Sequence, residues 1–156
     1  MIEDRYIHEF SFYAVRWKGD FVIRCKIEPS FHALYDQGDI IIFQDNDHWI
    51  KYAYENSDIG QPVMVSVVTN GVSDDCNGMP MSGAVWMQIT RQGNNFALHY
   101  SQDGIQWKLS RIFRLMLDDE VLVGISAQCP FGESCKVIFS NLELLPNTYT
   151  NIRKPQ

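Results

Sequence analysis

The chain lacks the features that would direct it to a membrane, a secretory route or a nucleic acid. Among its 156 residues, no apolar run approaches the roughly 20 residues of a membrane-spanning helix. The opening residues Met1–Arg5 contain no apolar run of the kind found in signal peptides. A net charge of −6, with no basic stripe, argues against nucleic-acid binding. We therefore expect a soluble, cytoplasmic protein with no nucleic acid and no membrane among its partners.

Cysteine is scarce, and its spacing is not that of a metal site. The four cysteines form no C-x-x-C pair and the four histidines are scattered, so no metal and no cofactor is expected. Cys25 alternates with apolar neighbours, which is typical of a small core residue. Cys129 and Cys135 flank a turn-like loop and could face each other across a hairpin. Without a secretory signal, reduced thiols are expected there rather than a disulfide.

Helical periodicity is also missing, whereas strand patterns recur at short intervals. Hydrophobic residues make up 46% of the chain and aromatic residues 13%, enough for a core. Alternation of apolar and polar side chains predicts about ten strands. They are expected at Phe10–Val15, Phe21–Ile27, Ile40–Phe43, His48–Glu55, Val63–Thr69, Val85–Thr90, Phe96–Ser101, Trp107–Leu117, Val121–Gln128 and Lys136–Leu145. This spacing predicts an all-β fold, a sandwich or jelly roll of two antiparallel sheets.

The breaks between these strands give the expected organisation. A single domain is predicted for residues 1–145, followed by a polar, peripheral tail at 146–156. Pro29 should end the second strand, because proline cannot donate to a ladder. The polar stretch Asn70–Gly83, which contains Cys76, is predicted to be a surface loop. Asp103-Gly104 indicates a tight hairpin.

The stretch Tyr35–Glu55 organises the rest of the chain. It begins with a continuous apolar run, Ile40–Phe43, as expected of a strand with little water on either side. A polar turn follows, and a half-buried strand then alternates its side chains. Three acidic or amide side chains of the turn, Asp45–Asp47, offer oxygens for calcium, but a hairpin tip is the commoner explanation. His48 and His99 have no partner in sequence and are expected on the surface.

In order and spacing, several segments together resemble the concanavalin A-like jelly-roll family named for regulation of enolase protein. The segments that carry the resemblance are YDQ through HWIKYAYE (Tyr35–Glu55), VSVVTNGVSD (Val65–Asp74), AVWMQITRQG (Ala84–Gly93), HYSQDGIQWKLSRIFRL (His99–Leu115) and VLVGISAQCP through VIFSNLEL (Val121–Leu144). The resemblance implies two antiparallel sheets, one of them concave. Relatives in the wider superfamily bind or cleave carbohydrate on the concave face.

Some positions depart from the family pattern. Asp39 stands where the family usually has glycine, Phe43 where it has arginine, and Cys76 where an aromatic residue usually follows the Ser-Asp pair. The N-terminal segment is also shorter than is usual in the family. If that segment supplies site residues, the resemblance implies a reduced site in this protein.

Two strands carry sets of side chains suited to binding a polar ligand. An exposed indole can stack on a sugar ring while neighbouring polar groups bind its hydroxyls. Both tryptophans could instead be semi-buried against loops. The expected ligand-binding residues are Trp49, Lys51, Glu55, Ser66, Trp86, Gln88, Tyr35 and Gln37. We expect stacking on Trp86 or Trp49 on the concave sheet. At the loop-to-strand junction, Asp36 is expected to close a turn.

Signatures of hydrolytic enzymes are absent. No G-x-S-x-G elbow is present, so a serine hydrolase is unsupported. A glycosidase needs two carboxyl groups roughly 5–9 Å apart. Only Glu55, of seven glutamates, lies on the expected site face, and its partner would come from a loop, such as Asp74. We therefore expect no catalytic residues.

Three functions remain open from the sequence. The leading hypothesis is a non-catalytic, lectin-like domain that binds a carbohydrate or related polar metabolite on the concave sheet. The alternative is a protein-interaction or regulatory module that acts on a carbon-metabolism enzyme. A glycoside hydrolase that uses Glu55 is the third.

Overall fold

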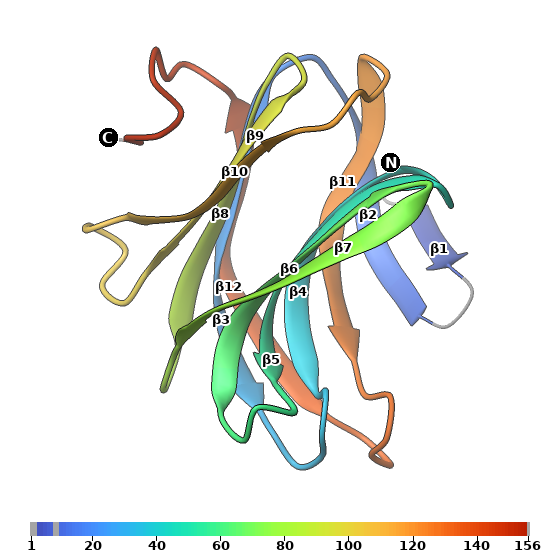
Figure 1. The fold of residues 1–156 in the computed structure, drawn as a ribbon, viewed down its shortest axis with the longest axis vertical. Helices are drawn as coiled ribbons and strands as arrows, with labels where there is room; N and C mark the ends of the chain where they lie inside the picture. Colours follow the sequence, from blue (N-terminus) through green and yellow to red (C-terminus); the bar gives the residue numbers. More distant parts are fainter. Residues whose placement is uncertain (1–2, 8–9, 156) are drawn as a thin grey trace.

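The described residues, 3–7 and 10–155 of a computed structural model, form twelve β-strands and no helix (Figure 1). The larger sheet has seven antiparallel strands, in the spatial order β1 (Glu3–Ile7), β2 (Phe10–Lys18), β11 (Glu120–Gln128), β4 (Gln37–Asp45), β5 (His48–Asn56), β6 (Pro62–Asn70) and β7 (Val72–Pro80). The smaller sheet has five, in the order β10 (Lys108–Arg114), β9 (Asn95–Ser101), β8 (Val85–Gln92), β3 (Phe21–Ser30) and β12 (Lys136–Pro146). The predicted all-β sandwich of two antiparallel sheets is confirmed.

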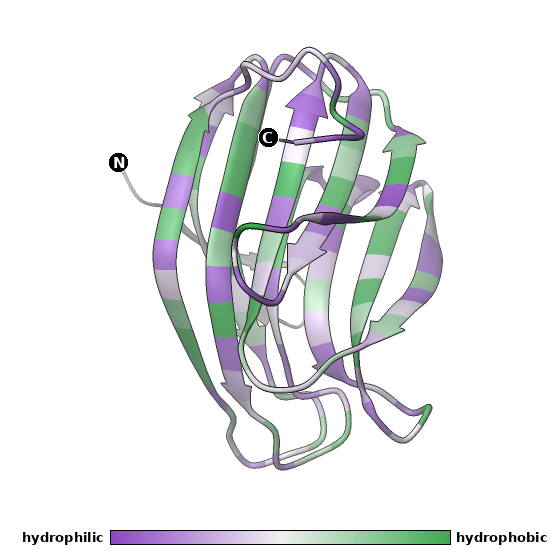
Figure 2. Cartoon of the chain, turned by 90° about the vertical axis from the view of Figure 1, so that its left-hand side faces the viewer, coloured by the Kyte–Doolittle hydropathy of each residue, from purple (hydrophilic) through white to green (hydrophobic). Residues whose placement is uncertain are grey.

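The main core lies between the sheets. It contains the inward-facing side chains of each sheet, among them Ile40 and Tyr52 from the larger sheet and Met87 and Ile89 from the smaller one. Figure 2 shows hydrophobic and hydrophilic residues alternating along many of the strands. Cys25 is fully buried in this core, as predicted.

The larger sheet is also apolar on parts of the face that points away from the core, called here the outer face. Ile41 and Phe43 of β4 pack there with Phe12, Ala14 and Leu122, beside a partly buried tryptophan. Strand β4 is therefore covered on both sides, and Ile40–Ile42 have no exposed surface. This explains the continuous apolar run in the sequence.

The stretch predicted as a surface loop at 70–83 is instead largely a strand. Strand β7 pairs with β6 at the edge of the larger sheet, and every one of its residues is exposed. An edge strand that buries neither face needs no apolar alternation, so the pattern that identifies half-buried strands is missing. The prediction of a loop was wrong for this reason.

Strand β3 also extends beyond its predicted end. Pro29 lies within it and is paired with Val137 of β12. The pairing of β3 with β8 ends at Ile27, so Pro29 has a neighbouring strand on one side only. Proline is tolerated where a strand has an open side, because its missing N–H then costs no ladder bond there.

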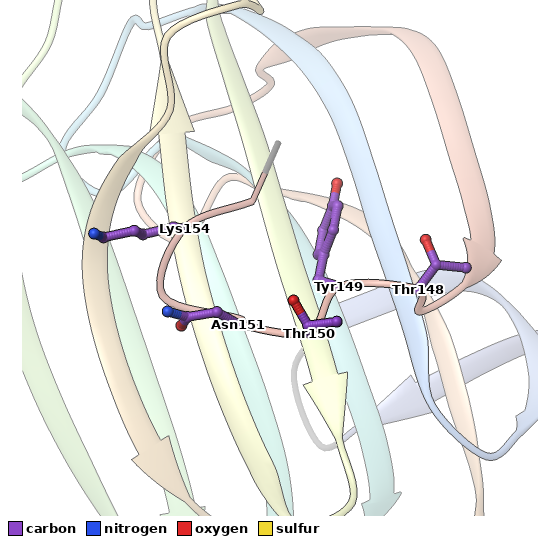
Figure 3. A pocket seen from close by; sticks show the side chains of 5 residues that line it. All are labelled: Thr148, Tyr149, Thr150, Asn151 and Lys154. Carbon is purple, nitrogen blue, oxygen red and sulfur yellow. The ribbon is translucent and has the colours of Figure 1, made fainter.

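The segment after β12 lies against the outer face of the smaller sheet (Figures 1 and 3). Ile152 is only 5% exposed, and Tyr149 accepts a 3.3 Å hydrogen bond from the Gln92 side chain through its backbone oxygen. A shallow cavity of about 350 Å³ runs along the segment and is lined by Thr148, Tyr149, Thr150, Asn151 and Lys154. The segment is thus packed, where a peripheral tail was expected, and the domain boundary at 145/146 stays a prediction.

His99 shows what this packing does. It was expected on the surface, but it has no exposed area, and its Nε2 lies 3.4 Å from the backbone oxygen of Arg153. Burial lowers the pKa of this imidazole, although the Arg153 contact acts in the other direction.

Within the described residues no helix is long and apolar enough to cross a membrane. Met1 and Ile2, part of the segment searched for a signal peptide, lie outside the described residues.

Candidate ligand-binding face

The outer face of the larger sheet changes from apolar at one end to polar at the other. Strand register places its side chains in rows that cross β11, β4 and β5. The rows, from the polar end, are Gln128–Gln37–Glu55, Ser126–Asp39–Ala53, Gly124–Ile41–Lys51 and Leu122–Phe43–Trp49. Adjacent rows lie two residues apart on the same strands, so neighbouring polar groups are within reach of one ligand. We call this surface the polar face.

Asp39 lies at the centre of the polar face. Its side chain is fully buried, and Oδ2 accepts a 2.9 Å hydrogen bond from Nε2 of Gln128. Burial raises the pKa of this carboxyl group to about 7, although the nearby Lys51 ammonium acts to lower it. The carboxyl group can therefore be present as a donor or as an acceptor near neutral pH.

Glu55 is a second buried acid, one row away. It is 7% exposed, and burial raises its pKa, opposed by the charge of Lys51 and reinforced by Asp75 and Asp58. Asp75 reaches this face because its pairing with Val67 puts it on the outer side of β7. The polar face thus has several acids around one ammonium group.

Tyr35 lies at the rim of the polar face. Its φ of 62° is unusual for a residue with a side chain, and its ring packs against Phe131 with centroids 5.7 Å apart. Desolvation raises the pKa of its hydroxyl, as do a hydrogen bond to Asp58 and the charges of Asp58 and Glu55. The hydroxyl is therefore directed toward the acidic end of the face.

Three buried polar atoms on this face have no hydrogen-bond partner among the residues that the structure describes. They are Oε1 of Gln37, Oδ1 of Asp39 and Oγ of Ser126. All three residues lie in the two rows at the polar end. A buried polar atom without a partner costs free energy, which a ligand hydroxyl placed there would recover.

The expected site residues thus divide between several places. Trp49, Lys51, Glu55, Tyr35 and Gln37 share the polar face or its rim. Asp39, Ser126 and Gln128 belong to it too, and the sequence reasoning missed them as ligand-binding residues. An acid in an otherwise apolar strand, at a position where the family has glycine, was the one signal that pointed to Asp39.

Ser66 points the other way. It is paired with the core residue Tyr52, and its Oγ accepts a 3.2 Å hydrogen bond from Nη1 of Arg111 on the smaller sheet. The same arginine lies 3.3 Å from the Asp74 carboxylate. Asp74 therefore faces away from Glu55, so the carboxyl pair suggested for a glycosidase is not present.

Trp86 and Gln88 belong to β8 of the smaller sheet, so the expectation that both tryptophans lie on one sheet was wrong. Gln88 is fully buried and donates a 3.2 Å hydrogen bond to Oγ1 of Thr90. Trp86 borders a cavity of about 340 Å³, whose lining is Arg24, Trp86, Gly104, Trp107, Asn141 and Glu143. A Cβ at Gly104 would lie 2.8 Å from Cε2 of Trp86, so the hairpin covers part of the indole.

Two further expectations concern the β4–β5 hairpin and the turn before β4. Nδ1 of His48 lies 2.8 Å from Oδ1 of Asp45, so His48 does have a partner. Asp45 also accepts a hydrogen bond from the backbone of Asp47, which favours the hairpin-tip interpretation over calcium. Asp36 closes the turn as predicted, because its Oδ2 accepts hydrogen bonds from the backbone of His32 and Ala33.

Comparison with known proteins agrees with the resemblance found in the sequence. A family described as "Protein of unknown function (DUF1349)" matches residues 3–147. "Regulation of enolase protein 1" of Saccharomyces cerevisiae (strain ATCC 204508 / S288c) is 32% identical over 135 residues, which are 85% of this chain and 68% of that protein. The predicted resemblance is confirmed.

Solved structures agree on the fold. A functionally unknown protein from Saccharomyces cerevisiae has a TM-score of 0.83 and 30% identity, over 88% of this chain and 75% of that chain. The carbohydrate-binding module CBM66 from Bacillus subtilis has a TM-score of 0.61 and 11% identity, over 93% of this chain and 91% of that chain. At that identity the likeness to CBM66 concerns the fold alone.

Proposed function

The chain belongs to the DUF1349 family, and we propose that it is a non-catalytic, lectin-like domain that binds a carbohydrate or related polar metabolite on the polar face. The jelly-roll fold of a carbohydrate-binding module is compatible with this activity but does not specify a ligand. The function rests on the site itself.

One observation carries the proposal. Gln37, Asp39 and Ser126, in two neighbouring rows of the polar face, each have a buried oxygen without a partner within residues 3–7 and 10–155. Each such atom costs about 1–3 kcal/mol when it is left unsatisfied. Sugar hydroxyl groups donate and accept at once, so a polyol can satisfy closely spaced oxygens of this kind. A buried acid whose pKa is about 7 can also accept or donate as the hydroxyl requires.

Trp49 supplies an apolar surface at the other end of the same face. Trp49 is partly buried and packs against the cluster that contains Phe12, Ile41 and Phe43, so part of the residue stays open to a ligand. Trp49 and Glu55 are six residues apart on β5, or about 20 Å at the rise of an extended strand. A ligand that contacts both must therefore be elongated, as an oligosaccharide is.

The charges on the face favour a neutral ligand. The buried acids Asp39 and Glu55 both lie near the ammonium of Lys51, and Asp75 adds a further negative charge near Glu55. An anionic group brought among them would meet like charge at short range. We therefore expect neutral glycans to bind more tightly than uronic acids or sulfated glycans.

A glycan array followed by calorimetric titration of its best neutral hit tests the proposal. Trp49→Ala should weaken binding roughly tenfold or more, because a stacking contact is worth on the order of 1–3 kcal/mol. Lys51→Met keeps the apolar stem, removes the ammonium group and should also weaken binding. Trp86→Ala on the other sheet is the matched control and should bind like the unsubstituted protein.

Thermal melting shows whether each variant is folded. An array without any hit, or Trp86→Ala abolishing binding while Trp49→Ala leaves it intact, would remove the polar face as the site.

A second candidate is a regulatory module that docks onto a carbon-metabolism enzyme, because the curated relative is named for regulation of enolase. Edge strand β7 favours it, since its unpaired side can accept a further strand and Val72 and Met79 are 78% and 55% exposed.

Titration of purified enolase with the protein separates the candidates. Binding that Val72→Lys abolishes and Trp49→Ala spares favours docking, whereas glycan binding without enolase binding favours the polar face. We propose a cytoplasmic location, where docking onto a carbon-metabolism enzyme would take place.

A further inference from the structure

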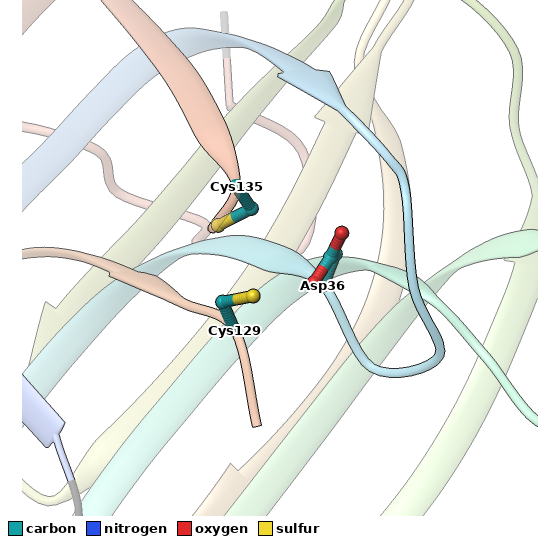
Figure 4. Close-up of side chains that lie close together, drawn as sticks. All are labelled: Asp36, Cys129 and Cys135. Atoms are coloured by element: carbon teal, nitrogen blue, oxygen red, sulfur yellow. The ribbon is translucent and has the colours of Figure 1, made fainter. Parts of the chain in front are cut away.

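Three side chains that bind metals in other proteins meet at one end of the sandwich, beside the polar face. Asp36 lies just before β4, Cys129 just after β11 and Cys135 just before β12. One ligand atom from each lies within 4.8 Å of the other two. Figure 4 shows the side chains approaching from separate segments, with the sulfur of Cys129 pointing toward Asp36.

Asp36 is held in place for such a role. The residue is fully buried, and its Oδ2 accepts hydrogen bonds of 2.8 and 2.9 Å from the backbone N–H groups of His32 and Ala33. Its Oδ1 is buried without a backbone partner among the described residues, and the Cys129 thiol is the side chain that can donate to the carboxyl group. Two backbone N–H groups that donate to the same side chain favour its ionised form, a carboxylate.

The loop between the cysteines approaches Oδ1 closely. A Cβ at Gly132 would lie 2.8 Å from Sγ of Cys129, 3.0 Å from Cβ of Ala33 and 3.6 Å from Oδ1 of Asp36. A larger residue at 132 would therefore have to displace these groups. Glycine lets the loop close over the carboxylate and bring a sulfur next to it.

We propose that Asp36, Cys129 and Cys135 bind a thiophilic divalent cation of the zinc class. Two sulfur ligands exclude the hard cations calcium and magnesium, which prefer oxygen. Tetrahedral zinc with Zn–S bonds of about 2.3 Å holds two sulfurs about 3.8 Å apart. Because the ligand atoms already lie within 4.8 Å of one another, a movement of about 1 Å or less completes the site. Three protein ligands leave the fourth position open.

A disulfide between the two cysteines accounts for less of the geometry. It would use both sulfurs but leave Oδ1 of Asp36 buried and without a partner. A cation uses all three groups and neutralises the buried carboxylate. Cysteine binds metals as the thiolate, so binding displaces a proton from each sulfur.

The cation would join the polar face to the loop between β11 and β12. Gln37 and Gln128, which belong to the row at the polar end of that face, are paired across β4 and β11. Asp36 and Cys129 are their next neighbours along the chain. The proposal of a metal site does not depend on what the polar face binds.

Titration of the reduced, metal-free full chain with Zn²⁺ against a chromophoric chelator tests the site. We expect one ion per chain and, with Co²⁺, the charge-transfer absorption of a cobalt–thiolate bond. Cys129→Ser, Cys135→Ser and Asp36→Asn should each lower zinc affinity at least tenfold, since even an outer-shell change typically costs 10–100-fold. The Asp36→Asn variant keeps a side-chain oxygen that can accept hydrogen bonds from the backbone N–H groups of His32 and Ala33. Cys76→Ser, an exposed thiol elsewhere, is the control and should bind like the unsubstituted chain.

Melting of each metal-free variant establishes that it is folded, and Zn²⁺ should raise the melting temperature of the unsubstituted chain but not of Cys129→Ser. If Cys129→Ser does not fold, the zinc affinity and the melting of Asp36→Asn and Cys135→Ser are compared with those of the unsubstituted chain instead. The proposal is overturned if the reduced chain takes up no zinc, or if the three variants keep the affinity of the unsubstituted chain. A 129–135 disulfide in a chain that takes up no zinc would make the pair a redox pair instead.

Discussion

Asp39→Asn should change how stability depends on pH. Burial raises the pKa of Asp39 from 3.8 to about 7 in the folded protein, while in the unfolded chain the group titrates near its ordinary value. Between these two values the folded state holds a proton that the unfolded state has lost. The contribution of this group to the free energy of unfolding is therefore fully present below about pH 4 and is lost as the pH rises to about 7.

The structure sets the size of this effect. A difference of about 3 pKa units at 1.36 kcal/mol per unit corresponds to about 4 kcal/mol. Asparagine cannot titrate and keeps an oxygen that accepts the Gln128 hydrogen bond. The unsubstituted protein should thus lose this contribution as the pH rises from 4 to 8, whereas Asp39→Asn should not. The difference in unfolding free energy between the two should shift by about 4 kcal/mol in favour of the variant over this range.

Urea unfolding at half-unit pH steps measures this difference, with the slope m checked for constancy. Asp103→Asn is the control. Backbone hydrogen bonds from Gln106 and Ile105 lower the pKa of Asp103, so its contribution to stability is lost only in acid, as the pH falls below about 4, and its difference from the unsubstituted protein should stay nearly constant from pH 4 to pH 8. A difference between Asp39→Asn and the unsubstituted protein that stays constant from pH 4 to pH 8 would refute a raised pKa at Asp39.

The remaining predictions concern packing, a loop and the thiols. Gly124→Ala should lower the free energy of unfolding by several kcal/mol in urea melts, because its Cβ would lie 2.0 Å from the backbone oxygen of Tyr13. A loss below 1 kcal/mol would show that β2 and β11 can separate there. Arg91→Lys should lower the free energy of unfolding by about 1–3 kcal/mol in the same assay. Arg91 donates to four backbone carbonyls, which a single ammonium group cannot reach together. An unchanged urea midpoint would show that these hydrogen bonds do not stabilise the fold. Mass spectrometry of protein alkylated at lysis should find Cys129 and Cys135 reduced, and a linked peptide would indicate an oxidising compartment instead.

The sequence by itself determined the fold class and much of the local structure. Alternation along a strand is a local property, because successive side chains point to opposite faces whatever the strand pairs with. It therefore placed Trp49, Lys51 and Glu55 on one face and Cys25 in the core. The continuous run Ile40–Phe43 indicated a strand covered on both sides, and the segments that carried the family resemblance led to the jelly roll.

Only the tertiary structure decided which strands are neighbours and which side chains other parts of the chain bury. Alternation tells which residues of a strand share a face, but it does not tell which sheet the strand joins or what lies over that face. This is why Trp49 and Trp86 were expected on one sheet and lie on two. His99 is buried by a segment about fifty residues away in sequence, a contact that no local pattern reports.

Burial on the polar face has the same origin. Asp39 was visible only as a departure from glycine. Burial between β11 and β5, the two strands beside β4, raises its pKa, and its partner Gln128 is 89 positions away in the sequence. Asp36 and Cys129 are far apart in the sequence and are brought together by the pairing of β4 with β11. Cys135 follows Cys129 by six residues, at the start of β12 in the other sheet. Local side-chain chemistry could be predicted, whereas the sites depend on contacts between residues far apart in the chain.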